Sequence, residues 1–285
     1  MTEAADRAAS GTVRDGAASD GTARPGAAPE GPAVRCVPAI PSWVSLMASD
    51  LDAAQAFYGP LLGWSFRPGP DRWGPYVRAM VGGVAVAGLS ASADLQLPVN
   101  WTTYFGAENA DVVAERVRAR AEEVAIGPLG FDDGRLAIAA DPDGAPFGIW
   151  EGGPAMGPTL RSIPGAPVWI ELRTFDAFAA ALFYGEVFAW DNRDPDELET
   201  RWEHDRVVLR TERQSVAALA VATDPEARPS WNVYFSVPDA DAAVELAEGL
   251  GADVLGEVLD TPYGRVAHLR DPQGGRFSLL SAKQD

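Results

Sequence analysis

Apolar positions along the chain switch repeatedly between the spacing of strands and the spacing of helices. Residues 43–48 form a short apolar run that predicts a strand. A helix is predicted to begin near Ser49 and Asp50, because the apolar positions that follow share one helical face. Those positions are Ala54, Phe57, Tyr58, Leu61 and Leu62 in the first half, and Ala180, Phe183, Tyr184, Val187 and Phe188 in the second.

Further segments follow in the same order in both halves. Strands are predicted at residues 76–80 and 84–89, and correspondingly at 207–211 and 216–222. Another strand, 101–106 or 231–237, leads into a second helix, 110–122 or 239–250. The last strands end the halves at 147–151 and 277–281. The pattern predicts an α+β fold in which each half holds two βαβββ units, four in the chain.

The two halves are copies of one another. Asp50 is followed seven residues later by a Phe-Tyr pair and fourteen residues later by Trp64, and Asp176 repeats these distances up to Trp190. The offset is 126 residues here and 130 residues in the later motifs. A repeat of this length indicates a duplicated domain rather than a solenoid. The later motifs are Trp101-Thr-Thr-Tyr104-Phe105 with Trp231-Asn-Val-Tyr234-Phe235, and Asp141-Pro-Asp-Gly144 with Asp271-Pro-Gln-Gly274.

Composition divides the chain into four segments. Residues 1–36 are rich in Ala, Gly and Pro and lack aromatic residues. A disordered tail is predicted there, because such a segment buries too little apolar surface to offset its ordering entropy. Residues 37–151 and 168–282 form the two predicted domains, each long enough for its own core. Residues 152–167, rich in Pro and Gly, are predicted to link them.

The chain has an excess of acidic residues, which limits the kinds of molecule it is expected to bind. The chain has 41 Asp and Glu against 23 Lys and Arg, a formal charge of −18, which argues against nucleic acid or an anionic membrane as partner. It shows neither a transmembrane-length apolar run nor a secretory signal, so a cytoplasmic location is expected. Cys36 is the only cysteine, which excludes an intrachain disulfide. No nucleotide-binding glycine motif or serine nucleophile elbow is present, and no cofactor is predicted.

The opening and the ending of each copy resemble a known superfamily. A strand, an Asp, a helix with Phe-Tyr, then Gly-Trp and a closing Asp-Pro-x-Gly are similar to the vicinal oxygen chelate proteins. These include glyoxalases, extradiol dioxygenases and bleomycin- or fosfomycin-resistance proteins. The tandem arrangement over about residues 40–282 is most similar to two-domain proteins described as glyoxalase-like or hydroxylase. The resemblance implies a curved mixed sheet around a cleft, but this scaffold hosts many reactions.

The resemblance also implies where metal ligands would lie. Metal-dependent members place His, Gln or Glu on the first strand, on the strand that opens the second unit and on the last strand. A one-residue slip of this alignment would bring Glu151 or Glu171 nearer. As aligned, the six places offer none of the imidazole, carboxylate or thiolate ligands that divalent ions prefer, so no metal site is predicted. They hold Trp43, Thr102, Gly148, Trp169, Asn232 and Ser278.

Strand alternation predicts which side chains face the cleft in which relatives bind substrate. Ile170 and Leu172 suit the face under the helix, so Trp169, Glu171 and Arg173 should face the cleft. A lining of Trp, Tyr and Met is typical of a pocket for a flat or apolar organic ligand. The predicted substrate-binding residues are Trp43, Met47, Tyr104, Trp150, Trp169, Arg173, Asn232 and Ser278.

Three residues are candidates for acid–base chemistry: Glu171, Tyr234 and His268. Glu171 in a largely apolar cleft suits a general base, with a Tyr or a His as the acid. Each also has a structural interpretation. Glu171 can form an ion pair with Arg173, Tyr234 can anchor a neighbouring strand, and His268 can be a hydrogen-bonded core residue.

The polar candidates gather in the second copy. Ser45 and Met47 stand in the first copy where the second has Glu171 and Arg173, and an Ile stands where the second has His268. Chemistry is therefore predicted in the second domain. Tryptophans such as Trp43 in the first domain suit either a ligand wall or plain core.

Two classes of function stay open, and the sequence favours the first. In it, the protein is an enzyme of specialised metabolism that acts without a metal on a hydrophobic aromatic or polyketide-like molecule, as an isomerase, lyase or cyclase. The alternative is a non-catalytic protein that sequesters an antibiotic-like molecule. A metal-dependent glyoxalase or dioxygenase is a third interpretation, and it requires ligands that the sequence does not show. Both a monomer and a homodimer fit, because tandem copies supply internally what a single-domain relative obtains by dimerising.

Overall fold

The computed structural model describes residues 38–91, 98–121, 124, 126–131, 134–152, 163–211, 214–222 and 228–283. The predicted tail, residues 1–36, and residues 153–162 of the predicted linker lie outside the described residues. None of the described helices combines the length and the apolar character needed to cross a membrane.

The first copy forms one mixed sheet of eight strands. Its elements are β1 (Pro41–Ala48), α1 (Leu51–Leu62), β2 (Ser65–Pro68), η1 (Asp71–Trp73), β3 (Tyr76–Val81), β4 (Val84–Ala91), β5 (Asn100–Gly106), α2 (Ala110–Ala121), β6 (Ile126–Phe131), β7 (Gly134–Ala140) and β8 (Pro146–Gly152). The strand order is β2-β3-β4-β1-β5-β8-β7-β6. At its centre β1 runs parallel to β4 and antiparallel to β5, so the two βαβββ units join side by side.

The second copy repeats this plan in a sheet of nine strands. Its elements are β9 (Pro167–Thr174), α3 (Ala177–Phe188), η2 (Trp190–Asn192), β10 (Glu199–Glu203), β11 (Arg206–Arg210), β12 (Ser215–Val221), β13 (Ser230–Ser236), α4 (Ala240–Gly249), β14 (Asp253–Val254), β15 (Leu259–Thr261), β16 (Gly264–Arg270) and β17 (Arg276–Ser281). The order is β10-β11-β12-β9-β13-β17-β16-β14, with β15 also paired to β16. The central strand β9 is parallel to β12 and antiparallel to β13, as β1 is to its neighbours in the first copy.

These two sheets confirm the predicted α+β fold with tandem glyoxalase-like domains. Several strands have no counterpart among the predicted ranges, β2 and β10 among them. β2 and β10 have mostly exposed side chains, so no apolar face marks them in the sequence. The domain boundaries stay predictions: β8 ends at Gly152 and β9 begins at Pro167, beside the proposed linker.

The first helix of each copy begins at the predicted aspartate. The side chains of Asp50 and Asp176 accept hydrogen bonds from backbone N–H groups of the first helical turn, which otherwise lack partners. The helix ends also correspond. Gly63 ends α1 with a φ of 66°, and Ala189 ends α3 in the same left-handed conformation with a φ of 54°.

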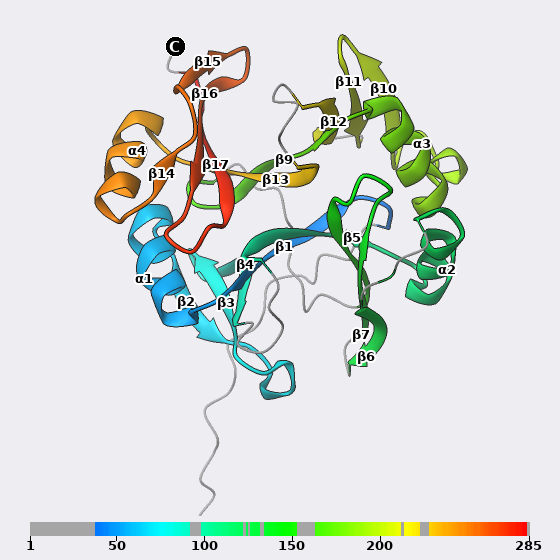
Figure 1. Ribbon diagram of the computed structural model, residues 1–285, viewed down its shortest axis with the longest axis horizontal. Helices are drawn as coiled ribbons and strands as arrows, with labels where there is room; N and C mark the ends of the chain where they lie inside the picture. The colour runs from blue at the N-terminus through cyan, green and yellow to red at the C-terminus, as the bar shows by residue number, and fades with distance from the viewer. Residues whose placement is uncertain are drawn as a thin grey trace, which may run out of the picture. The chain divides into compact units, whose positions relative to one another are not determined.

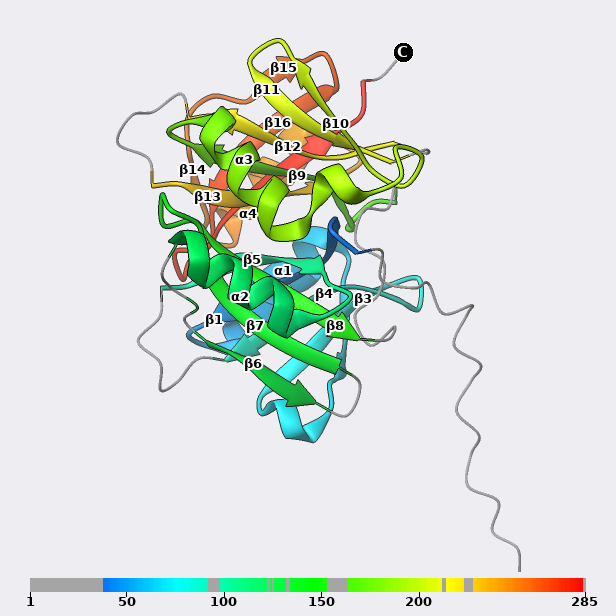
Figure 2. The same cartoon turned by 90° about the vertical axis from the view of Figure 1, so that its right-hand side faces the viewer.

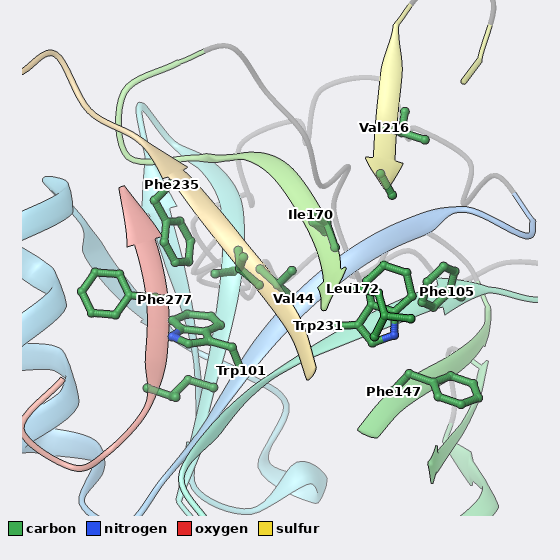
Figure 3. Close-up of a cluster of buried hydrophobic side chains, with 14 of the residues drawn as sticks. Val44, Trp101, Phe105, Phe147, Ile170, Leu172, Val216, Trp231, Phe235 and Phe277 are labelled. Carbon is green, nitrogen blue, oxygen red and sulfur yellow. The ribbon is translucent and has the colours of Figure 1, made fainter. Parts of the chain in front are cut away.

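The two copies share one apolar core, in which the tryptophan of each copy's repeated Trp-x-x-Tyr-Phe motif packs against the phenylalanine of the other copy's motif. The rings of Trp101 on β5 and Phe235 on β13 are 5.0 Å apart, and those of Phe105 on β5 and Trp231 on β13 are 5.1 Å apart. Figure 3 shows these side chains gathered between the strands of both copies. The duplicated sequences therefore meet about a local two-fold relationship.

Helices of the two copies lie in pairs around this core. α1 contacts α4, and α2 contacts α3, as Figure 1 shows at its left and right edges. Strand β5 of the first sheet contacts β13 of the second. Turned by a quarter, the strands of the first copy occupy the lower half of Figure 2 and those of the second the upper half. The core packing thus uses the helix-bearing face of each sheet.

Candidate functional site

Each sheet has a face away from its helices, here called the helix-free face. In β9, Ile170 and Leu172 are fully buried in the core shared with the helices. Because alternate residues of a strand point to opposite faces, Trp169, Glu171 and Arg173 lie on the helix-free face. This is the orientation that the sequence predicted.

Glu171 is the centre of a charged cluster on the second helix-free face. Its side chain is only 2% exposed. One carboxylate oxygen, Oε1, lies 2.6 Å from Arg173 Nη2 and accepts a hydrogen bond from the Tyr234 hydroxyl at 3.2 Å. The other, Oε2, lies 3.0 Å from Nη1 of Arg206, which comes from β11. These four residues, the Glu171 cluster, place two cations on one buried carboxylate.

The strand pairing explains why these four residues meet. β9 pairs with β13 on one side, which sets Glu171 opposite Asn232 and Trp169 opposite Tyr234. On the other side β9 pairs with β12, and β12 pairs with β11, which brings Arg206 into the same row as Arg173. The cluster is therefore held by four hydrogen-bonded strands of the second sheet, β11, β12, β9 and β13.

Burial and the neighbouring charges shift the titration of the cluster. Burial, aided by the Glu171 carboxylate, raises the pKa of Tyr234 to about 12, so its hydroxyl stays protonated at neutral pH. Burial acts to lower the pKa of Arg173, but the carboxylate of Glu171 raises it, and the net shift is upward. Both groups thus keep their hydrogen-bond donors across the physiological range.

His268 lies beside the cluster on β16. Its Nδ1 is 2.8 Å from the Ser278 hydroxyl oxygen, and its ring meets the ring of Tyr234 edge to face with centroids 5.8 Å apart. Burial, and then the charge of Arg173, lowers the pKa of His268, so the imidazole is neutral at pH 7. With Nδ1 engaged by Ser278, Nε2 is the ring nitrogen left for a ligand.

The other predicted site residues of the second copy differ in exposure and in their hydrogen-bond partners. Trp169 is half-buried on the same face as Glu171. The Asn232 amide donates to the carbonyls of Ser230 at 3.1 Å and Glu171 at 3.5 Å, so its amide is directed at backbone. Ser278 is 1% exposed and contacts His268 rather than solvent.

The first helix-free face is filled by its own aromatic side chains. Trp43 and Trp150 are fully buried, Tyr104 is 7% exposed, and the three pack together as a cluster. The Tyr104 ring lies flat against Gly148, where an added Cβ would come within 2.0 Å of it. Met47 is half-buried nearby on the same strand as Trp43. These contacts agree with the plain-core interpretation, and a binding role for these residues stays a prediction.

Arg206 is the member of the cluster that the sequence prediction missed. The apolar pattern predicts its strand only from residue 207 onward, and strand spacing alone does not set the register of β10, β11 and β12. Val207 and Leu209 lie in the shared core, which places residues 206, 208 and 210 on the other face, but Val208 is apolar and buried as well, so the sequence has no alternation that marks the face of Arg206. The second helix-free face is therefore more polar than predicted.

The chemistry of the donors decides whether a metal of the kind bound in this superfamily fits. In the second copy the three ligand places hold Trp169, Asn232 and Ser278, of which none offers an imidazole or a carboxylate. The nearby carboxylate of Glu171 is already paired with two guanidinium groups. Among the described residues, no group of three or more His, Cys, Asp and Glu is arranged to hold an ion. These residues do not fit such a site.

Two cavities of the structure lie away from both clusters. One of about 360 Å³ is bounded by α2 and by the end of α3, with Arg116, Phe188 and Arg193 among its walls. The other, of about 300 Å³, lies between α3 and the β10–β11 hairpin, beside Phe178 and Trp202. Neither contains a residue of the Glu171 cluster.

Known proteins resemble the chain over most of its length. A model of the glyoxalase-like domain matches residues 169–280. A Mycobacterium tuberculosis protein named "Putative glyoxylase CFP32" is 33% identical over 247 residues, which cover 84% of this chain and 94% of that protein. A Streptomyces protein named "Anthracycline biosynthesis protein DauV" is 32% identical over 270 residues, 88% of this chain and 96% of that protein.

Solved structures share the fold at low sequence identity. The Mn(II)-bound glyoxalase from Novosphingobium aromaticivorans superposes with a TM-score of 0.55 at 18% identity, covering 87% of this chain and 83% of that one. The trihydroxybiphenyl dioxygenase from Sphingomonas wittichii gives a TM-score of 0.55 at 12% identity, covering 86% and 91%. The sequence identities to full-length relatives, the shared fold and the recurring motifs agree: the chain belongs to the glyoxalase-like family of the vicinal oxygen chelate superfamily, in its tandem two-domain form.

Proposed function

We propose that the helix-free face of the second copy binds an aromatic, polyketide-like small molecule and catalyses proton transfer on it without a metal. The observation that carries this proposal is the asymmetry between the copies. The second face holds a buried carboxylate, two partly exposed arginines, a protonated tyrosine and a neutral histidine side by side. The name of the Streptomyces relative, an anthracycline biosynthesis protein, supports an aromatic polyketide as substrate class.

Trp169 supplies a flat apolar surface beside these polar groups. It is half-buried on β9, two residues from Glu171 and on the same face. Indole rings stack favourably on planar aromatic molecules, and few convergent polar groups then suffice to orient the ligand. This combination suits a substrate with fused rings and oxygen substituents.

His268 is the residue best placed to accept a proton. It is half-buried, its lowered pKa keeps it neutral at pH 7, and in the tautomer whose Nδ1–H donates to the Ser278 hydroxyl, Nε2 is an acceptor. A general base needs a free lone pair within reach of the substrate, and imidazole meets this at neutral pH. Tyr234, protonated and next to His268, is then the candidate proton donor.

Glu171 as the general base stays a prediction, and its contacts favour a positioning role. Both of its oxygens accept from or pair with neighbouring side chains, Arg173 and Tyr234 on one and Arg206 on the other. A carboxylate engaged in this way fixes the arginine and tyrosine donors in place. The same observation favours the second candidate function, a binding protein without catalysis, because binding needs no free base.

Hydrogen–deuterium exchange separates these functions without knowledge of the natural reaction. Anthrone is a suitable probe, because its methylene protons are exchanged through an enol tautomer. In deuterated buffer near neutral pH, the protein should accelerate the exchange, followed by NMR, by roughly a hundredfold or more over buffer, the scale of general acid–base catalysis. Binding of anthrone without acceleration would favour the binding protein.

Two variants assign the base. His268→Asn should abolish the acceleration while anthrone still binds, and His204→Asn should not, because His204 is the other histidine of the chain and is exposed on the β10–β11 turn. Glu171→Gln should leave measurable exchange if Glu171 positions the arginines. Loss of exchange in Glu171→Gln with retained activity in His268→Asn would return the base role to Glu171.

A further inference from the structure

The Glu171 cluster contains two guanidinium groups and one carboxylate, which leaves one positive charge in excess. Arg173 and Arg206 both pair with Glu171, at 2.6 Å and 3.0 Å, and remain 28% and 30% exposed. One guanidinium group is enough to neutralise one buried carboxylate, so the second is in excess. Each guanidinium has five N–H donors, of which the contacts to Glu171 use only a part.

The surrounding groups leave this excess in place. Tyr234 is protonated and His268 is neutral at pH 7. Asp205 lies 3.3 Å from Arg206 Nε, but its carboxylate is 76% exposed, so water screens the pair. Glu203, the strand neighbour of Arg206, pairs with Arg210 at 3.3 Å. A local positive charge therefore persists in a protein whose formal charge is −18.

The first copy shows that the fold does not require these charges. From the strand registers, Met47 occupies the place of Arg173, and Tyr76 on β3 occupies the place of Arg206. Ser45 occupies the place of Glu171. The same sheet thus forms with uncharged side chains at all three places, and the charged set belongs to the second copy.

We propose that Arg173 and Arg206 bind an anionic oxygen of the ligand, so that the substrate is an aromatic molecule bearing a carboxylate or an ionised enol or phenol. This inference rests on the proposed function and adds the charge of the substrate to it. A planar guanidinium donates parallel hydrogen bonds that match a carboxylate or two neighbouring ring oxygens. In this arrangement the Glu171 carboxylate holds the guanidinium groups of Arg173 and Arg206 at a fixed separation. The indole ring of Trp169 provides the adjacent apolar surface for the aromatic rings.

Paired probes test the proposal. An anthraquinone carboxylic acid and its carboxamide have the same rings and differ in charge, and alizarin, a hydroxyanthraquinone, changes colour when its phenol ionises. Binding is measured by quenching of tryptophan fluorescence at pH 7. We expect the carboxylate to bind roughly tenfold to a hundredfold more tightly than the amide, the range for a hydrogen bond to a charged group. Bound alizarin should show its ionised spectrum below the pH at which the free dye ionises.

Substitution of Arg206 ties this preference to the cluster. Arg206→Gln should remove the preference for the carboxylate and the spectral shift of alizarin, while binding of the amide stays within about twofold. Arg206→Lys, which retains the charge, should keep part of both. Arg67→Gln is the matched control, because Arg67 is exposed on β2 and its loss changes the net charge equally. Circular dichroism checks that each variant is folded.

The outcomes separate this inference from the proposed function. Equal binding of acid and amide together with no spectral shift of bound alizarin overturns the anion site and leaves an aromatic-binding face. A preference for the acid without a shift for alizarin supports a carboxylate, and the reverse supports an ionised phenol or enol. Binding of none of the three probes would contradict the proposed function, and the anion site with it.

Discussion

Tyr58 on α1 donates a hydrogen bond of 2.7 Å to Asp271 Oδ2 of the second copy, and both residues are buried. Its counterpart Tyr184 on α3 donates to Asp141 Oδ2 at 3.1 Å. The other oxygen of each aspartate accepts backbone N–H groups of its own Asp-Pro-x-Gly turn. The two motifs that recur in each copy therefore meet across the copies, which accounts for their presence in both.

Tyr58→Phe should lower the free energy of unfolding by about 1–3 kcal/mol, because it leaves a buried carboxylate without one of its donors. The indole N–H of Trp101, which donates to the Tyr58 hydroxyl at 3.0 Å, loses its acceptor as well. Urea denaturation followed by circular dichroism measures the change. Tyr263→Phe is the control: Tyr263 is 72% exposed, and a change within about 0.5 kcal/mol is expected there. If Tyr58→Phe and Tyr263→Phe have the same free energy of unfolding, the Tyr58–Asp271 hydrogen bond does not stabilise the fold.

Ala189→Gly should stabilise the protein by about 0.5–1 kcal/mol, because Ala189 ends α3 with a φ of 54°, a conformation that costs an L-residue energy and that glycine adopts freely. The reciprocal variant Gly63→Ala should destabilise by a similar amount, because an added Cβ there meets no atom within 4 Å and only the backbone conformation is strained. Thermal unfolding of both variants measures the pair. Shifts of the same sign would contradict the account.

Much of the fold was predictable from the duplication. Apolar spacing indicates both helices of each copy, and the aspartates before α1 and α3 mark where those helices begin, because a side-chain carboxylate caps free N–H groups. The misses have a physical cause. β2 and β10 lie at sheet edges with exposed side chains, where no apolar alternation is needed.

The sequence predicts the site residues only where their positions depend on alternation along a single strand. Alternation along β9 placed Glu171 and Arg173 on one face, since Ile170 and Leu172 had to be buried. Arg206 lies beside Arg173 because β11, β12 and β9 pair in a particular register. Tertiary contacts set this register, so strand spacing in the sequence does not predict it. Whether Trp43 would line a cleft or fill it depended on packing across the sheet, which one sequence does not determine.

Gly148→Ser should destabilise the first domain by about 1–3 kcal/mol through overpacking, because the new Cβ would lie 2.0 Å from the Tyr104 ring. The second copy accommodates Ser278 at this place, with the Tyr234 hydroxyl held by Glu171 instead. Urea denaturation measures the change. Gly130→Ser on β6 serves as control, because an added Cβ there meets no atom within 4 Å. A neutral Gly148→Ser would mean that the first helix-free face has room for a ligand.

Alkaline pH should unfold the protein through its tyrosines. Burial raises the pKa of Tyr76 and Tyr234 to about 12 and shifts the pKa values of Tyr58, Tyr104 and Tyr184 upward as well. Unfolded tyrosine ionises near pH 10. Since the folded state holds its phenolic protons more tightly, the associated stability is complete below about pH 10 and is lost as the pH rises toward 12.

Absorbance of tyrosinate near 295 nm follows this titration. Burial raises the pKa of five of the six tyrosines, so most of the signal should appear only well above pH 10, together with the loss of ellipticity. Reversible ionisation of several tyrosines near pH 10 in the folded protein would be incompatible with the burial described.

A crystal structure of the protein soaked with alizarin is the most direct test of the proposed site. We expect the rings of alizarin against Trp169 and its ionised oxygen within hydrogen-bond distance of Arg173 or Arg206. Alizarin bound instead in the cavity beside α2 and α3, or beside the β10–β11 hairpin, with no density at the Glu171 cluster, would contradict the assignment of function to the second helix-free face.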